Sequence, residues 1–88
     1  MKKVDFTISV VGGAGIGVFI KVDGHVLHFA SSSTQSVDLA PGDYTAALSG
    51  AEPSSASVNI QVIENGAVLA NTTYDTPTFW GFLAFTVN

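Results

Sequence analysis

Apolar and polar residues alternate one by one through most of this 88-residue chain. Residues 4–10, which read VDFTISV, are a clear example, because every second position is apolar. Side chains of a β-strand point alternately to its two faces, so this pattern predicts a strand with one buried face. The same pattern recurs along the chain, and no stretch has a convincing helical period. The chain is therefore predicted to be all-β.

The dipeptide Asp-Gly at residues 23–24 is the strongest turn signal in the first half of the chain. A two-residue type I′ turn needs positive φ at both central positions, and this dipeptide adopts such values at little cost. The turn would pair Ile20 with Leu27 and Val18 with Phe29. All four side chains would then lie on one face, so turn and pattern predict the same hairpin.

The Asn-Gly pair at residues 65–66 allows two hairpin registers. A two-residue turn would place Ile60 opposite the polar Asn71. A three-residue loop with Gly66 in the left-handed conformation would place Ile60 opposite Ala70 instead. The second register keeps apolar residues together, and it is the one predicted here.

Turn signals of this kind divide the chain into about seven or eight short strands. One of them is Pro41-Gly42, which fits the central pair of a type II turn. Short connections at regular spacing favour an antiparallel β-sandwich, prealbumin-like or Ig-like, over units of parallel strands and helices. No linker is long enough to divide the chain, so residues 1–88 are predicted to form one domain.

Composition excludes several classes of function. The chain has three lysines, no arginine and a net charge of −4, whereas nucleic-acid binding depends on basic side chains that neutralise phosphates. Anionic membrane surfaces are disfavoured for the same reason. Charged residues make up only 11% of the chain, against about 25% in typical soluble domains. This shortage predicts that a partner covers part of the surface.

The N-terminal region resembles a signal peptide only in its first residues. Met1, Lys2 and Lys3 suit such a start, but Asp5 interrupts the progression to an apolar segment, and no cleavage site follows. The uncharged run 10–20 is shorter than the ~20 residues of a spanning helix, so no membrane insertion is expected. Localisation stays open, with a trimmed extracellular or cell-surface domain as one alternative.

The sequence predicts no catalytic residues, no metal ligands and no cofactor. The glycine-rich run 12–17 enters a strand pattern and lacks the lysine and helix of a phosphate-binding loop, so it is interpreted as a flexible or bulged connection. His25 and His28 are three residues apart on a predicted strand, so their side chains cannot converge on one ion. No serine or carboxylate constellation predicts an enzyme.

Three aromatic residues are the candidate binding site. If Phe79, Leu83 and Phe85 face the core, Trp80 and Phe82 must face outward. Phe19 must also face outward if its two neighbours, Val18 and Ile20, face the core. Large apolar residues on an outer face indicate a protein interface or a platform for a ligand. The alternative is that the last strand bulges at Gly81 and returns Trp80 to the core.

Two segments resemble a known family. Residues 20–24, IKVDG, and residues 37–45, VDLAPGDYT, resemble the PEGA and carboxypeptidase-regulatory-like modules. Residues 31–34, SSST, depart from the small apolar or proline segment usual before the second strand. The resemblance implies a prealbumin-like sandwich that is a non-catalytic part of a bacterial surface or secreted protein.

These observations predict a protein-interaction or self-association module. The alternative is a module that binds a carbohydrate or another small ligand through Trp80 and the polar loops at 31–34 and 52–57. A third class, an enzyme without a recognisable motif, has no residue pattern in its favour.

Overall fold

The computed structural model describes residues 1–12, 16–52 and 56–88. Two predicted connections, the glycine run and the polar loop at 52–57, lie partly outside these residues. The described residues form eight β-strands, β1 (Lys2–Val11), β2 (Gly17–Val22), β3 (His25–Phe29), β4 (Ser33–Leu39), β5 (Gly42–Ala51), β6 (Ser57–Glu64), β7 (Ala67–Tyr74) and β8 (Thr78–Val87).

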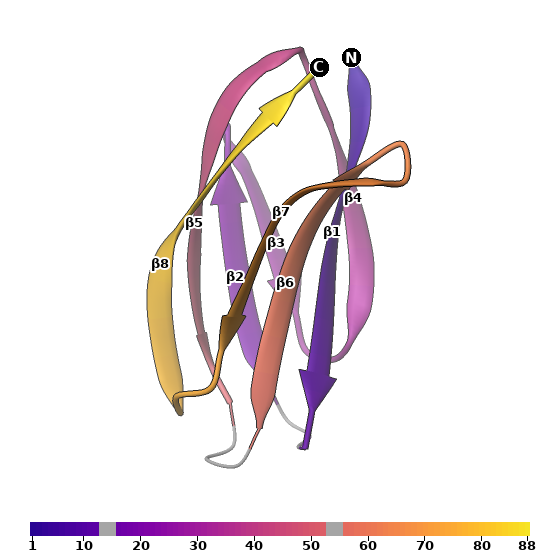
Figure 1. Cartoon of the computed structure of the whole chain (residues 1–88). Helices are drawn as coiled ribbons and strands as arrows, with labels where there is room; N and C mark the ends of the chain where they lie inside the picture. Colours follow the sequence, from indigo (N-terminus) through magenta and orange to yellow (C-terminus); the bar gives the residue numbers. More distant parts are fainter. Residues whose placement is uncertain (13–15, 53–55) are drawn as a thin grey trace.

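The strands form two four-stranded antiparallel sheets that pack face to face (Figure 1). The first sheet has the order β4-β1-β6-β7, and the second has the order β3-β2-β5-β8. We call them sheet A and sheet B. The prediction of an all-β antiparallel sandwich is confirmed.

The core is made of the apolar residues that alternate along each strand. Val4, Phe6 and Ile8 of β1 are buried, as are Val18 and Ile20 of β2. The same holds for the inner positions of β6, so the strands that lie inside each sheet carry the most regular pattern. Burial of this one set of faces is the main driving force for folding.

The hairpin at residues 23–24 has the predicted register. Ile20 pairs with Leu27, and Val18 pairs with Phe29. Asp23 and Gly24 have φ values of 46° and 81°, as a type I′ turn requires.

The prediction for the second glycine hairpin was wrong. Asn65 and Gly66 both have positive φ, 50° and 79°, and form a two-residue turn. A bulge next to this turn then shifts the register, so that Val62 lies opposite Ala70 and Ile60 opposite Thr72. The bulge keeps Asn71 off the inner face. The three-residue loop was predicted for this same reason.

The predicted type II turn at Pro41-Gly42 is also not observed. Gly42 has a φ of 154°, far from the value of about 80° that such a turn requires, and it begins β5. The connection is held instead by Tyr44, whose hydroxyl donates a hydrogen bond to the carbonyl oxygen of Ala40 at 2.6 Å.

Different contacts join the two sheets along their two open sides. On one side, the Gln35 side chain of β4 donates a hydrogen bond to the backbone carbonyl of His28 in β3 at 2.5 Å. On the other side, the rings of Tyr74 in β7 and Phe79 in β8 stack with centroids 4.4 Å apart. Glycine at position 81 leaves room for the tyrosine hydroxyl.

Gly50 makes room for the other ring of this stack. A β-carbon at position 50 would lie 2.6 Å from Cζ of Phe79 and 2.7 Å from the carbonyl oxygen of Gly17. We therefore expect Gly50→Ala to lower the free energy of unfolding by about 1–3 kcal/mol, measured by urea denaturation.

Gly17→Ala is the matched control, because a β-carbon at Gly17 would meet no atom within 4 Å. This variant should be as stable as the wild type, or slightly more stable, since alanine restricts the unfolded chain. Equal stability of the two variants would contradict the packing role of Gly50.

Candidate functional site

The outer face of sheet B aligns its side chains in rows across all four strands. Phe19 of β2 lies between His28 of β3 and Ser49 of β5, and Ser49 in turn lies opposite Trp80 of β8. The next row runs through Val26, Lys21, Ala47 and Phe82. We call the aromatic and apolar members of these two rows the aromatic face, and they are Phe19, Val26, His28, Ala47, Trp80 and Phe82.

The structure resolves the alternatives for Trp80. β8 pairs with β5 in an unbroken register from Thr78 to Val87, without a bulge at Gly81. Trp80 therefore points outward and is 78% exposed, and Phe82 is 69% exposed. The inner side of Gly81 faces the hydroxyl of Tyr74, which fills the space that a returning tryptophan would need.

Phe19, the third predicted residue, lies on the same face but is less exposed, at 49%. The imidazole of His28 stacks on its ring, with centroids 4.6 Å apart and planes inclined by 23°. His28 and Val26 are members of the site that the sequence analysis did not include. The hairpin register at residues 23–24 already placed His28 opposite Phe19, so the signal was available.

Small residues of β5 lie between the aromatic residues of this face. Ala47 and Ser49 separate Phe19 on β2 from Trp80 and Phe82 on β8. Because neighbouring strands are about 4.8 Å apart, the backbones that carry the two aromatic sides are about 9.5 Å apart. The face thus carries small side chains between two groups of large ones.

Lys21 is the charged member of the two rows, between Val26 and Ala47. Its flexible stem can lie along apolar surface while its ammonium group stays in water. The face is therefore apolar with one cationic point, and a carboxylate or carbonyl oxygen of a bound molecule would be its natural partner.

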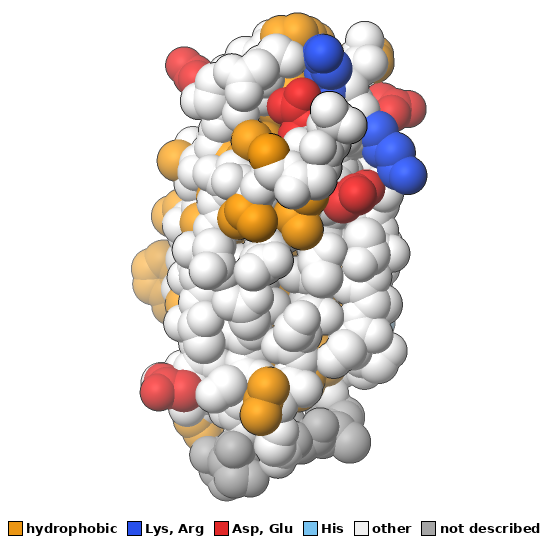
Figure 2. All heavy atoms as spheres, turned by 45° about the vertical axis from the view of Figure 1, so that its right-hand side comes forward, with side chains coloured by type: hydrophobic (Ala, Val, Ile, Leu, Met, Phe, Trp, Pro, Cys, Tyr) orange, Lys and Arg blue, Asp and Glu red, His pale blue; other side chains and the backbone are white. Residues whose placement is uncertain are grey.

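The outer face of sheet A has a different chemistry. Hydroxyl and amide side chains line it, and they bond to one another, as Thr7 does to Thr34 at 3.0 Å and Asn59 does to Asn71 at 2.6 Å. Figure 2 shows the β1 and β4 side of the molecule, where the middle is white and most charged side chains gather at the upper end. Several of the polar groups on this face are therefore already paired within the domain.

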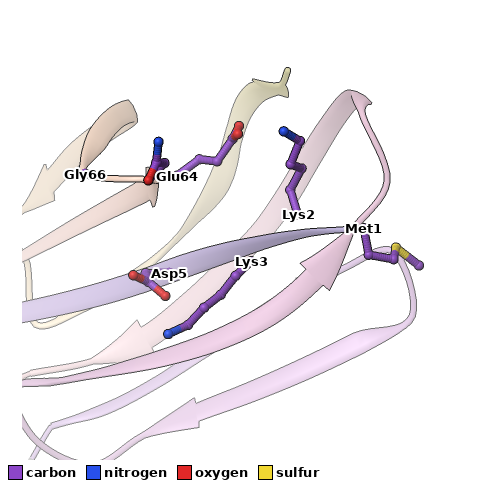
Figure 3. A pocket seen from close by; sticks show the side chains of 7 residues that line it. Met1, Lys2, Lys3, Asp5, Glu64 and Gly66 are labelled. Atoms are coloured by element: carbon purple, nitrogen blue, oxygen red, sulfur yellow. The ribbon is translucent and has the colours of Figure 1, made fainter.

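A groove of about 460 Å³ lies at that end, beside the turn between β6 and β7. Its lining combines both charge signs, from Lys2 and Lys3 and from Asp5 and Glu64. Figure 3 shows Lys2 and Glu64 on one side of β1 and Lys3 and Asp5 on the other. Since the charges are mixed and lie on different sides, the groove does not present one potential to a ligand.

The residues described contain no group of three histidine, aspartate or glutamate side chains placed to hold a metal ion. His28 is stacked on Phe19, and His25 is exposed beside the turn at residues 23–24.

Glu52 is the only polar or charged residue that is buried within the described part of the chain, and it is 7% exposed. Its backbone amide donates a hydrogen bond to the carbonyl oxygen of Pro77 at 2.8 Å. Neither carboxylate oxygen has a hydrogen-bond partner among the described residues. Burial raises the pKa of Glu52, and the carboxylate of Asp75 raises it further.

The chain was compared with family models, curated proteins and solved structures, and none of these comparisons found a match. In the ranges 1–12, 16–52 and 56–88 there is also no helix long and apolar enough to cross a membrane.

The raised pKa of Glu52 has a consequence for stability. The folded protein binds this proton more tightly than the unfolded chain, so the contribution of Glu52 to stability is greatest below its ordinary pKa of 4.5. It is lost as the pH rises through the raised value. We expect Glu52→Gln to raise the free energy of unfolding at pH 7 by on the order of 1 kcal/mol. The gain should shrink towards pH 4.5.

Urea denaturation of both proteins at several pH values measures this difference. Glu64→Gln is the matched control, because it makes the same change at a side chain that is only partly buried. A gain from Glu52→Gln that is independent of pH, or equal to that from Glu64→Gln, would contradict a buried ionised carboxylate.

Proposed function

We propose that this domain is a non-catalytic protein-association module and that the aromatic face of sheet B is its contact surface. The observation that carries the proposal is the exposure of Trp80 and Phe82 on one regular strand, with Phe19 on the other side of the small residues of β5. Large aromatic residues that cluster in this way dominate the energetics of protein interfaces.

The area involved supports this function. A fully buried aromatic side chain removes about 150–250 Å² from water. At their exposures, Trp80 and Phe82 together leave roughly 300 Å² open. An apolar area of this size is comparable to the largest apolar patch on a typical soluble monomer, which is often a functional surface.

The backbone that carries the face is already in place. The contact residues lie on strands paired in register, and the inner faces of these strands form the core. A partner would not have to order a loop on binding, so little backbone entropy would be lost. The resemblance of residues 20–24 and 37–45 to PEGA-like modules supports a place in a bacterial surface or secreted system.

The chain itself is the first partner to test. We expect light scattering after gel filtration to show an average mass that rises with protein concentration. The emission of Trp80, the only tryptophan in the chain, should shift to the blue as it becomes buried. Trp80→Ser should reduce the association at least tenfold, in line with the cost of removing an interface aromatic residue.

Val68→Ser is the matched control. Val68 is 55% exposed, but it lies on β7 at the edge of sheet A, away from the aromatic face. Both variants should retain the wild-type melting temperature, since neither side chain is part of the core. A protein that stays monomeric at all concentrations, with unchanged emission, would contradict association through this face.

A second candidate function is favoured by the small residues of β5 that lie between Phe19 and Trp80. A tryptophan with one free side can stack on a sugar ring, and Lys21 and Ser49 offer polar contacts beside it. Saturable quenching of Trp80 emission by a glycan, in a protein that stays monomeric, would support a carbohydrate-binding module. Unchanged emission across a broad glycan panel would exclude this function.

A further inference from the structure

Each sheet ends in two edge strands, and three of these four edges carry a feature that blocks further pairing. β4 carries the charge of Asp38, and β7 is interrupted by the bulge that follows residues 65–66. β3 has only five residues, and the carbonyl of His28 is already bonded to Gln35. Charges, bulges and short length are the usual means by which proteins keep sheet edges from pairing with other chains.

β8 has no charge and no bulge, and a side-chain hydrogen bond to its backbone is found, among the described residues, only at its first residue, where the carbonyl of Thr78 accepts from the hydroxyl of Thr76. It is ten residues long, TFWGFLAFTV, without a charge or a proline, and it pairs with β5 in one unbroken register. In the part of the chain that the structure describes, β5 is its one strand partner. In Figure 1, β8 lies at the left margin with no strand beyond it. Its outer edge is therefore an open template for another strand.

We propose that this edge pairs with β8 of a second copy, in antiparallel orientation, so that two B sheets join into one continuous eight-stranded sheet. The proposal names a partner for the association function proposed above. It depends on the edge of β8, however, and not on the contact of one aromatic face with another.

The pattern of β8 suits pairing with itself. Directly opposed residues of an antiparallel pair lie on the same face, so Trp80 and Phe82 of both copies would share the outer side. Leu83, which is only partly buried in one copy, would be covered on the inner side. Symmetric pairing over the length of β8 places either Phe82 or Leu83 on the two-fold axis.

Charge also favours a second copy at this edge. The chain carries a net charge of −4, so two copies repel each other over most orientations. Because β8 has no charged side chain, pairing along it opposes no like charges. The edge contact stays below the about 800 Å² per partner of a standard interface. The dimer should therefore dissociate on dilution.

The test uses two variants of opposite charge, Phe82→Lys and Phe82→Glu. With Phe82 on the two-fold axis, residue 82 lies directly opposite residue 82 of the second copy. With Leu83 on the axis, the two residues are diagonal neighbours. The two side chains are therefore within about 5–8 Å of each other in both registers. Each variant alone should therefore raise the dissociation constant of the dimer about tenfold or more. An equimolar mixture of the two should restore association as a heterodimer, measured by sedimentation velocity.

Hydrogen exchange supplies an independent readout. The β8 amides that point away from β5 should exchange rapidly in dilute wild-type protein and slowly at high concentration. Phe82 is 69% exposed, so both variants should keep the circular dichroism spectrum of the wild type.

Val26→Lys distinguishes edge pairing from packing of two aromatic faces, because it adds a charge to the aromatic face but on β3, about 14 Å from β8 across three strand spacings. Edge pairing predicts that this variant still dimerises. If Val26→Lys abolishes association and the mixed variants do not recover it, two aromatic faces pack on each other. That result would overturn edge pairing while leaving the proposed function intact. A wild type that is monomeric at all concentrations would overturn both.

Discussion

The packing of the two inner faces is the constraint on which the rest of the structure depends. Phe6 of sheet A and Phe85 of sheet B meet edge to face, with ring centroids 5.9 Å apart, and Phe85 also stacks on Tyr44. Side chains alternate along every strand, so a slip of one residue would carry an entire buried set to the surface. The tight turn at residues 23–24 fixes the register of β2 and β3 against such a slip, whereas the register of β6 and β7 is set by the turn at residues 65–66 together with the bulge that follows it.

The position of the aromatic residues on the outer face follows from this core. On its inner side β5 carries Gly50, where the ring of Phe79 fills the space. On its outer side it carries the small residues Ala47 and Ser49, and the large outer side chains Phe19 and Trp80 lie on its two neighbours, β2 and β8. The order of the strands thus places the large aromatic residues on either side of small ones.

Much of this arrangement could be predicted from the sequence, and the limits have physical causes. Alternation and the Asp-Gly turn predicted the fold class and the first hairpin, since both signals are local. The bulge in β7 was not predicted, because the sequence analysis compared only turn lengths and a bulge after a two-residue turn also keeps Asn71 off the inner face. Alternation alone predicted an outward Trp80, but it could not exclude a bulge at Gly81, whose inner side is covered by the hydroxyl of Tyr74 from the other sheet. Such contacts between sheets have no local signature.

The difference between the two outer faces determines where a partner can bind favourably. On sheet A the hydroxyl and amide groups already bond to one another, so a partner would have to break bonds such as that between Asn59 and Asn71. On sheet B the rings of Trp80 and Phe82 are exposed to water. Burying them against a partner contributes favourable free energy of binding and breaks no hydrogen bond. The strand that carries both rings is also the one whose edge is open. The same ten residues therefore combine the apolar surface that drives association with the backbone groups that can orient it.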